Sequence, residues 1–267
     1  MYPRSSDLDY LSHLSAESAR FLDVLRSTAP QAPVPTCPAW TAADLLWHLG
    51  RVQWFWGTIV RRGITDASDA NALQPARPPD QPGLIEFFET ASHDLAAALA
   101  RTDPARPAWT WASDQTVGFI RRRQVHEALI HRVDAELTAG CRTALDPRLA
   151  ADGIDESLTV LFGEAPGWAA FTPQDGRTVR VVAADTGDSW LATLGRLTGT
   201  DPDGNACDET AIAVAGADPG TEAAATVTGT AADLDCWLWN RPPAGTVRRA
   251  GRDDVLTDFG VMLAQGL

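Results

Sequence analysis

Lysine is absent from this 267-residue sequence, and its 22 arginines face 35 acidic residues, which gives a net charge of −13. Affinity for nucleic acid depends largely on a basic surface that neutralises phosphates, so this composition argues against a nucleic-acid partner and likewise against an anionic membrane surface. No run approaches the ~20 consecutive apolar residues that a membrane helix needs, and the first residues lack the apolar core of a secretory signal. We therefore expect a cytoplasmic globular protein.

Cysteine and histidine are also scarce. The four cysteines lie far apart in the sequence and form no C-x-x-C pair, which argues against both a disulfide scaffold and a cysteine-rich zinc site. Only five histidines are present, so few imidazoles are available as metal ligands. Hydrophobic residues, by contrast, make up 45% of the chain and charged residues 21%, as in an ordinary globular protein.

Charge is distributed unevenly along the chain. Residues 1–145 carry a net charge of −2, whereas residues 146–267 carry −11, which indicates two domains of different character. The first has the periodicity and capping signals of helices, with Thr41 and Asp44 as one capping pair and Asp114 as another cap. We expect helices over residues 6–26, 41–62, 84–101 and 114–139, and helices of this length joined by loops predict a four-helix bundle.

After Pro166 the periodicity changes to short alternating runs bounded by glycine and aspartate turns. We expect strands over residues 178–184, 189–194, 225–230 and 246–249, and helices over residues 146–162, 230–239 and 253–264. The predicted fold class is therefore α+β, with a helical bundle over residues 1–145 followed by a small α+β domain over residues 146–267.

His48 lies on the apolar stripe of the second predicted helix, between Leu45 and Val52. A buried imidazole without a hydrogen-bond partner costs roughly 1–3 kcal/mol, so His48 must have a partner. The pattern leaves two interpretations open: a core histidine bonded to a backbone carbonyl, or a ligand in a functional site.

Glu127 and His131 lie four residues apart on the fourth predicted helix and therefore share one face. Arg123 lies four residues before Glu127 and faces roughly the same way. One interpretation is an exposed Glu–His pair, which is worth only a few tenths of a kcal/mol. The other is a partly sheltered polar site, because the opposite face of this helix is apolar.

Taken together, His48, Glu127 and His131 supply two imidazoles and one carboxylate from two helices. Bundle cores hold metal sites of this kind, built from inward-facing side chains on neighbouring helices. The ligand set suits catalytic zinc, and it equally suits a non-haem iron(II) centre. Asp44 lies one turn before His48 and is a candidate to orient its second ring nitrogen, although the capping role competes for it.

Two motifs resemble those of a known family. The run Cys37–Gly50, CPAWTAADLLWHLG, is similar to the "CPGWTVADLLAHL" signature of the mycothiol-dependent maleylpyruvate isomerases, with Ala39 where the family usually has glycine. The segment Gln124–Ala135, QVHEALIHRVDA, matches the E-x-x-x-H signature of the same family. These proteins are DinB-like four-helix bundles, and the C-terminal region resembles the small sterol-carrier-like domain that many members append.

The resemblance implies a zinc ion at His48, Glu127 and His131, with the low-molecular-weight thiol mycothiol as cosubstrate. It also implies a C-terminal arginine in the active site, and Arg241 in the run Trp237–Arg241 matches that context. Arg123 is a second candidate to hold a substrate carboxylate. The predicted function is thus a zinc-dependent isomerase or S-transferase that uses an activated thiolate on a small electrophile. A metal-dependent hydrolase that activates water and a non-catalytic binder of metal or hydrophobic ligands are the alternatives.

Overall fold

The computed structural model describes residues 8–217 and 220–265. It has the predicted α+β class, and it divides into one compact unit over residues 9–143 and another from residue 144 onwards. None of the helices within the described residues is long and apolar enough to cross a membrane. One unit is helical and the other is built on a sheet.

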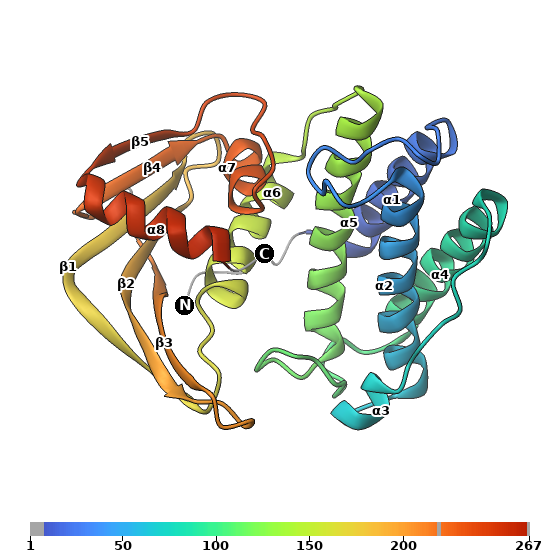
Figure 1. Cartoon of the computed structure of the whole chain (residues 1–267), viewed down its shortest axis with the longest axis horizontal. Helices are drawn as coiled ribbons and strands as arrows, with labels where there is room; N and C mark the ends of the chain where they lie inside the picture. The colour runs from blue at the N-terminus through green and yellow to red at the C-terminus, as the bar shows by residue number, and fades with distance from the viewer. Residues whose placement is uncertain (1–7, 218–219, 266–267) are drawn as a thin grey trace. The chain divides into compact units, whose positions relative to one another are not determined.

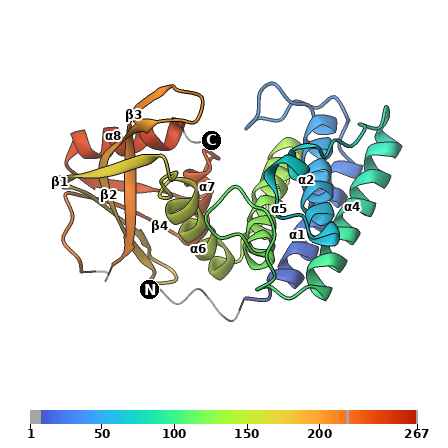
Figure 2. The same ribbon diagram turned by 90° about the horizontal axis from the view of Figure 1, so that it is seen from below.

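The first unit is a helical bundle in which the four long helices lie side by side (Figures 1 and 2). The strongest packing is between α2 and α4 and between α1 and α5, and the core includes Phe21 and Phe88, whose ring centroids lie 5.1 Å apart. Its helices are α1 (Tyr10–Arg26), α2 (Ala42–Arg62), the short α3 (Ala67–Asn71), α4 (Gln81–Arg101) and α5 (Val117–Ala139).

Side-chain caps define where the bundle helices begin. The predicted capping box of α2 is present, because Thr41 accepts a hydrogen bond from the Asp44 amide while Asp44 accepts one from the Thr41 amide. The predicted cap of α5 is wrong by two residues: the Thr116 hydroxyl accepts from the Phe119 amide at 3.2 Å, and Asp114 instead accepts from the Thr116 hydroxyl at 2.6 Å. Thr116 is therefore the N-cap, and Asp114 stabilises it by accepting a hydrogen bond from its hydroxyl.

The second unit is a five-stranded sheet with helices on one face. Its strand order is β3-β2-β1-β4-β5, and only β1 and β4 pair in parallel, so the chain crosses the sheet between β3 and β4. The strands are β1 (Ala169–Ala183), β2 (Ser189–Thr200), β3 (Ala206–Gly216), β4 (Ala225–Gly229) and β5 (Arg248–Gly251). The helices are α6 (Pro147–Glu156), its π-helical extension η1 (Ser157–Leu161), α7 (Ala231–Leu238) and α8 (Asp253–Gln265).

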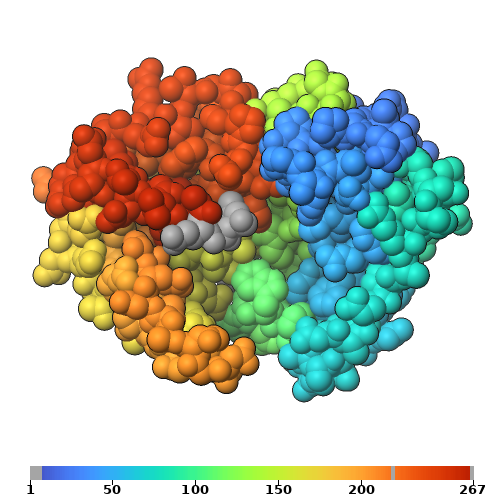
Figure 3. Space-filling view, in the orientation of Figure 1, coloured from blue at the N-terminus to red at the C-terminus, as the bar shows by residue number. Residues whose placement is uncertain are grey.

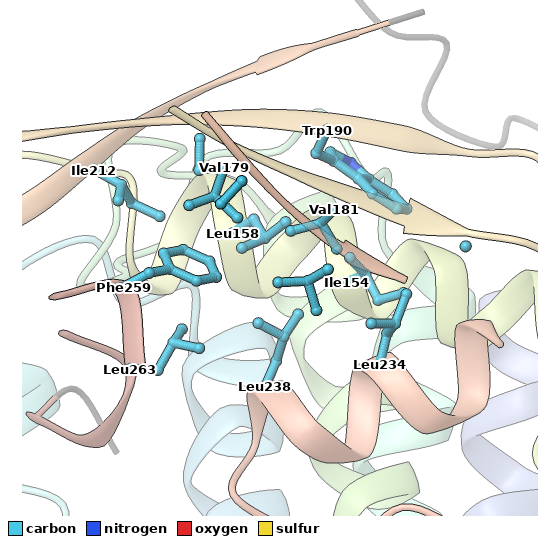
Figure 4. Packing of buried hydrophobic residues seen from close by; sticks show 14 of the residues in the cluster. Ile154, Leu158, Val179, Val181, Trp190, Ile212, Leu234, Leu238, Phe259 and Leu263 are labelled. Atoms are coloured by element: carbon cyan, nitrogen blue, oxygen red, sulfur yellow. The ribbon is translucent and has the colours of Figure 1, made fainter. Parts of the chain in front are cut away.

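The core of this unit lies between the sheet and its helices (Figure 4). Val179 and Val181 point from β1 towards Ile154 and Leu158, as expected for alternate residues of a strand with one buried face. Phe259 of α8 is buried in the same core. The outer side of α8, red in Figure 3, belongs to the surface of this unit, where Val261 is half exposed.

Two parts of the sheet differ from the prediction. The turn expected at Asp175–Gly176 lies inside a longer β1, where the register against β2 shifts between Pro173 and Thr178. Strand β3 was not expected at all, because most of its side chains are exposed or half-exposed and its sequence shows no clear alternation. Its place at the edge of the sheet accounts for that weak pattern.

Candidate metal centre

His48 is placed by the segment that precedes α2. The chain turns at Cys37–Trp40 and enters α2 through the Thr41–Asp44 capping box, which puts His48 in the second turn of the helix. The ring of Trp40 lies against the ring of His48, with centroids 4.7 Å apart, and 6.4 Å from that of His131. The tryptophan of the C-P-A-W run therefore packs on the imidazoles, a role that the sequence analysis did not assign.

Glu127 and His131 come from α5 and meet His48 through the side chain of Glu127. The Oε1 atom of Glu127 lies 3.4 Å from His48 Nε2 and 3.2 Å from His131 Nε2. One candidate ligand atom from each of the three residues lies within 4.8 Å of the other two. The structure thus brings together the three residues that the sequence singled out, from two different helices.

The centre is sheltered but reachable. The side chain of His131 is 8% exposed, that of Glu127 17% and that of His48 24%. Enough of the cluster is open for a fourth ligand to approach, as a catalytic rather than a purely structural metal site requires.

Asp134 holds His131 from behind. Its Oδ2 lies 2.9 Å from His131 Nδ1, and its Oδ1 accepts a hydrogen bond of 2.6 Å from the Thr36 hydroxyl. A carboxylate on Nδ1 fixes the ring orientation and directs Nε2 towards Glu127 and His48, as the partners of metal-bound histidines do. Asp134 was not among the predicted site residues, although its position three residues after His131 on the same helix was a signal for it.

Asp44 does not make the orienting contact that was predicted for it. Its Oδ2 accepts from the Thr41 amide at 2.9 Å and the Thr41 hydroxyl at 2.7 Å, while its Oδ1 pairs with Arg77 at 2.7 Å. Both carboxylate oxygens are therefore used at the start of α2, and the competing role as a cap is the one observed.

The two predicted arginines lie in different units. Arg123 Nη2 is 3.2 Å from Glu127 Oε2, so it pairs with the oxygen of Glu127 that faces away from the imidazoles. Arg241 lies just after α7 in the second unit, where its Nη1 donates to the Trp239 carbonyl at 2.6 Å. Arg123 is thus a direct neighbour of the centre through Glu127.

The local charges separate the protonation states of the three residues. Burial lowers the pKa of His48 below its ordinary value, which leaves a neutral ring able to donate a lone pair. Burial also opposes the charge of His131, but the hydrogen bonds with Asp134 and Glu127 outweigh it and raise the pKa of His131 to about 9. Burial opposes the charge of Glu127 as well, yet hydrogen bonds with both imidazoles hold its pKa well below the usual range.

This donor set fits a divalent cation. Ligands at 2.0–2.2 Å from a tetrahedral zinc are separated by roughly 3.3–3.6 Å, close to the 3.4 Å and 3.2 Å spacings around Glu127 Oε1. Without a metal ion, His131 holds a proton at this point, and Arg123 adds a positive charge beside the other oxygen of Glu127. A metal ion placed there would replace that proton.

Comparison with known proteins identifies both units. Residues 11–136 match the family model described as "Mycothiol maleylpyruvate isomerase N-terminal domain", and residues 148–257 match the "MDMPI C-terminal domain". The fold is similar to the crystal structures of the mycothiol-dependent maleylpyruvate isomerase and of a histidine-to-alanine mutant of it. Each aligns with a TM-score of 0.53 at 13% identity over 91% of this chain and 93% of that chain. No curated protein matches the sequence.

Proposed function

The chain belongs to the mycothiol-dependent maleylpyruvate isomerase family, and we propose that it is a thiol-dependent isomerase or S-transferase whose zinc centre is His48, Glu127 and His131. The observation that carries the proposal is the convergence of these three donors within 4.8 Å at a partly exposed point. The ligand types suit zinc, and the open side leaves room for a thiol. Iron(II) would suit the same residues and is an outcome of the test below.

The residues of this chain prepare the centre for a thiol. Zinc held there would lower the pKa of a coordinating thiol, so that the sulfur is a thiolate near neutral pH. Asp134 fixes the His131 ring, and Arg123 balances the charge of Glu127 from the far side. Addition of the thiol sulfur to a conjugated carbon turns the double bond into a single bond, rotation follows, and elimination returns the thiol. With a leaving group on the carbon, the same attack gives S-transfer.

The first test is metal content, measured by inductively coupled plasma mass spectrometry on untagged protein purified without chelator. We expect about one zinc per chain in the wild type and none in Glu127→Gln or His131→Gln. Glu86→Gln is the matched control, because Glu86 is an exposed glutamate of α4 in the same bundle. Iron in place of zinc would redirect the proposal to oxygen chemistry, and no metal even after zinc is added would overturn it.

Turnover is the second test. Zinc-loaded protein is assayed with mycothiol and maleylpyruvate, and with a panel of conjugated acids, by the absorbance change on isomerisation. We expect turnover that requires the thiol and disappears in Glu127→Gln. Thiol-independent hydrolysis of an ester or amide would instead support the water-activating alternative. Stoichiometric zinc without any turnover would support a metal-binding protein.

A further inference from the structure

A pocket of about 210 Å³ lies in the bundle between α2 and the segment after α3. Its walls are Arg51, Val52, Phe55 and Trp56 from α2, together with Leu73 and Pro75. An apolar cavity of ~150 Å³ is large enough for benzene, so this pocket is large enough for an aryl or short alkenyl group.

The pocket begins one helical turn beyond His48. Residues three, four and seven positions apart lie on one helix face, so Arg51, Val52 and Phe55 continue the face that carries His48. Burial, then the charge of His131 and then that of Arg51 lower the pKa of His48, which agrees with the proximity of Arg51 on this face. The pocket therefore lies on the face of α2 that carries His48, one turn further along the helix.

The charge of Arg51 is not committed to a protein partner. Within the described residues no carboxylate forms an ion pair with Arg51, whose side chain is exposed. Two other arginines near the centre are engaged, Arg123 with Glu127 and Arg77 with Asp44. Of these three, Arg51 is the one whose guanidinium is available to an anion from solution.

The other walls are apolar and held in place. The rings of Phe55 and Trp56 meet edge to face at 5.1 Å, and Trp56 stacks on Trp109 at 5.9 Å with an angle of 17°. Such contacts fix the walls before a ligand binds, which lowers the entropy cost of binding. One cation beside an apolar, aromatic pocket is complementary to a ligand with one carboxylate and an apolar body.

We propose that this pocket binds the electrophilic substrate, with Arg51 holding its carboxylate and Phe55, Trp56 and Leu73 enclosing an apolar remainder. The substrate class is then an unsaturated monocarboxylic acid with an aryl or alkenyl group. A short dicarboxylate would leave its second charge against apolar walls. The role of the pocket as a substrate site rests on the proposed function, but the binding of a carboxylate there can be measured without turnover.

The test is isothermal titration of zinc-loaded protein with three probes. These are trans-cinnamate, which has both features, cinnamyl alcohol, which lacks the charge, and maleate, which lacks the apolar body. We expect cinnamate to bind about tenfold more tightly than cinnamyl alcohol, because a charge-assisted hydrogen bond distinguishes them. We expect maleate to bind more weakly than cinnamate. Equal binding of cinnamate and cinnamyl alcohol would overturn the proposal.

Variants locate the effect. Arg51→Gln should abolish the preference for cinnamate over cinnamyl alcohol, so that the two bind about equally, and Arg51→Lys should retain part of the preference. Phe55→Ala should weaken the binding of both aryl probes. Arg62→Gln is the matched control, because Arg62 is an exposed arginine at the far end of the same helix. Equal losses in Arg51→Gln and Arg62→Gln would show a general charge effect and contradict the pocket.

The outcomes also separate this inference from the proposed function. The Arg51→Gln loss should persist in zinc-depleted protein, and a loss seen only with zinc would mean that the carboxylate binds the metal and would contradict the role of Arg51. Selective cinnamate binding without thiol-dependent turnover would support the binding pocket and contradict the proposed function. Thiol-dependent turnover of an unsaturated acid with the same KM in Arg51→Gln and wild type would keep the function and remove the pocket.

Discussion

Helix α5 carries two clusters of buried charge whose cations differ in kind. The His131 cluster, as we define it, consists of His48, Glu127, His131 and Asp134; the positive charge on its imidazoles is an exchangeable proton, while Arg123 pairs with the other oxygen of Glu127 from outside the cluster. The Arg132 cluster begins one residue further along the helix and is built around a guanidinium, which cannot be deprotonated in a protein. Its members are Glu17, Arg20, Arg132, Glu136 and Thr143.

The charged groups of the Arg132 cluster pair with one another. Glu136 is fully buried, and its two oxygens receive the Arg20, Arg132 and Thr143 side chains and the Thr143 amide at 2.7–3.1 Å. Arg132 pairs with Glu17 as well, at 2.6 Å. Apart from the Arg132–Glu136 pair within α5, the contacts join α5 to α1 or to the segment that follows the helix, so the cluster ties both to α5.

The comparison shows how one helix serves two purposes. A fixed cation makes a cluster structural, because its removal leaves buried carboxylates without compensation. A cluster whose cation is a proton can bind a metal ion instead, because a metal displaces protons from its ligands.

The largest expected effect is on stability. Glu136→Gln should lower the free energy of unfolding by about 3–5 kcal/mol, because it leaves Arg132 buried with fewer partners. Glu127→Gln should cost less, about 1–3 kcal/mol in zinc-depleted protein, because Arg123 loses its carboxylate partner while Asp134 still pairs with His131. Urea unfolding of both variants at pH 7, followed by the helical circular dichroism signal, tests this. Equal costs would mean that the His131 cluster is also primarily structural.

Two residues, one from each cluster, should respond to opposite ends of the pH range in zinc-depleted protein. The pKa of His131 is raised to about 9, so its contribution is present below its unfolded pKa of 6.5 and is lost as the pH rises through about 9. That interval corresponds to at most about 3 kcal/mol. The pKa of Glu136 is lowered, against the effect of burial, by hydrogen bonds from Arg20 and Thr143. Its contribution is therefore present above the unfolded pKa near 4.5 and is lost as the pH falls below it.

Unfolding measurements from pH 3 to 10 separate these contributions. His131→Gln should flatten the alkaline limb, and Glu136→Gln should reduce the acid limb, to which Glu127 also contributes because its pKa is lowered. Zinc should reverse the alkaline limb, because the metal competes with the His131 proton and binds better as that proton leaves. A wild-type alkaline limb that is flat without zinc would show that the proton on His131 does not stabilise the fold.

The orienting carboxylate should affect metal affinity by an intermediate amount. Asp134→Asn should weaken zinc binding about 10- to 100-fold, as does loss of other partners of metal-bound histidines. Thr36→Val is the graded control, because it removes only the hydroxyl that donates to Asp134. In zinc-depleted protein the His131 pKa, followed by NMR, should fall towards 6.5 in Asp134→Asn. An unchanged pKa would contradict the orienting role.

Local features of this chain were predictable from sequence, and contacts between helices were less so. The caps and ends of α2 and the shared face of Glu127 and His131 depend only on short spacings, and the structure shows them as predicted. The meeting of His48 with Glu127 depends on how α2 packs on α5, and the family motifs rather than the spacing predicted it. Strand β3 was missed because an edge strand exposes most of its side chains.

Asp134 and Asp44 show the same limit for single residues. Both lie within about one helical turn of a histidine: Asp134 is three residues after His131, and Asp44 is four residues before His48. Only the first makes the contact, because residues in the first turn of a helix can reach back to the unpaired amides at its start. Sequence distance therefore gives candidates, and the helix position decides between them.

The smallest predicted effect separates these two roles for Asp44. Asp44→Ala should lower the free energy of unfolding by about 1 kcal/mol, as does loss of a helix cap, while zinc affinity stays within about twofold. Thr41→Ala removes the other half of the same capping box, so the double variant should lose less than the sum of the two single losses. Zinc affinity is measured by competition with a chromogenic chelator. A tenfold loss of affinity in Asp44→Ala, without such a loss in Thr41→Ala or in Arg77→Gln, which removes the other partner of Asp44, would restore Asp44 as a partner of His48.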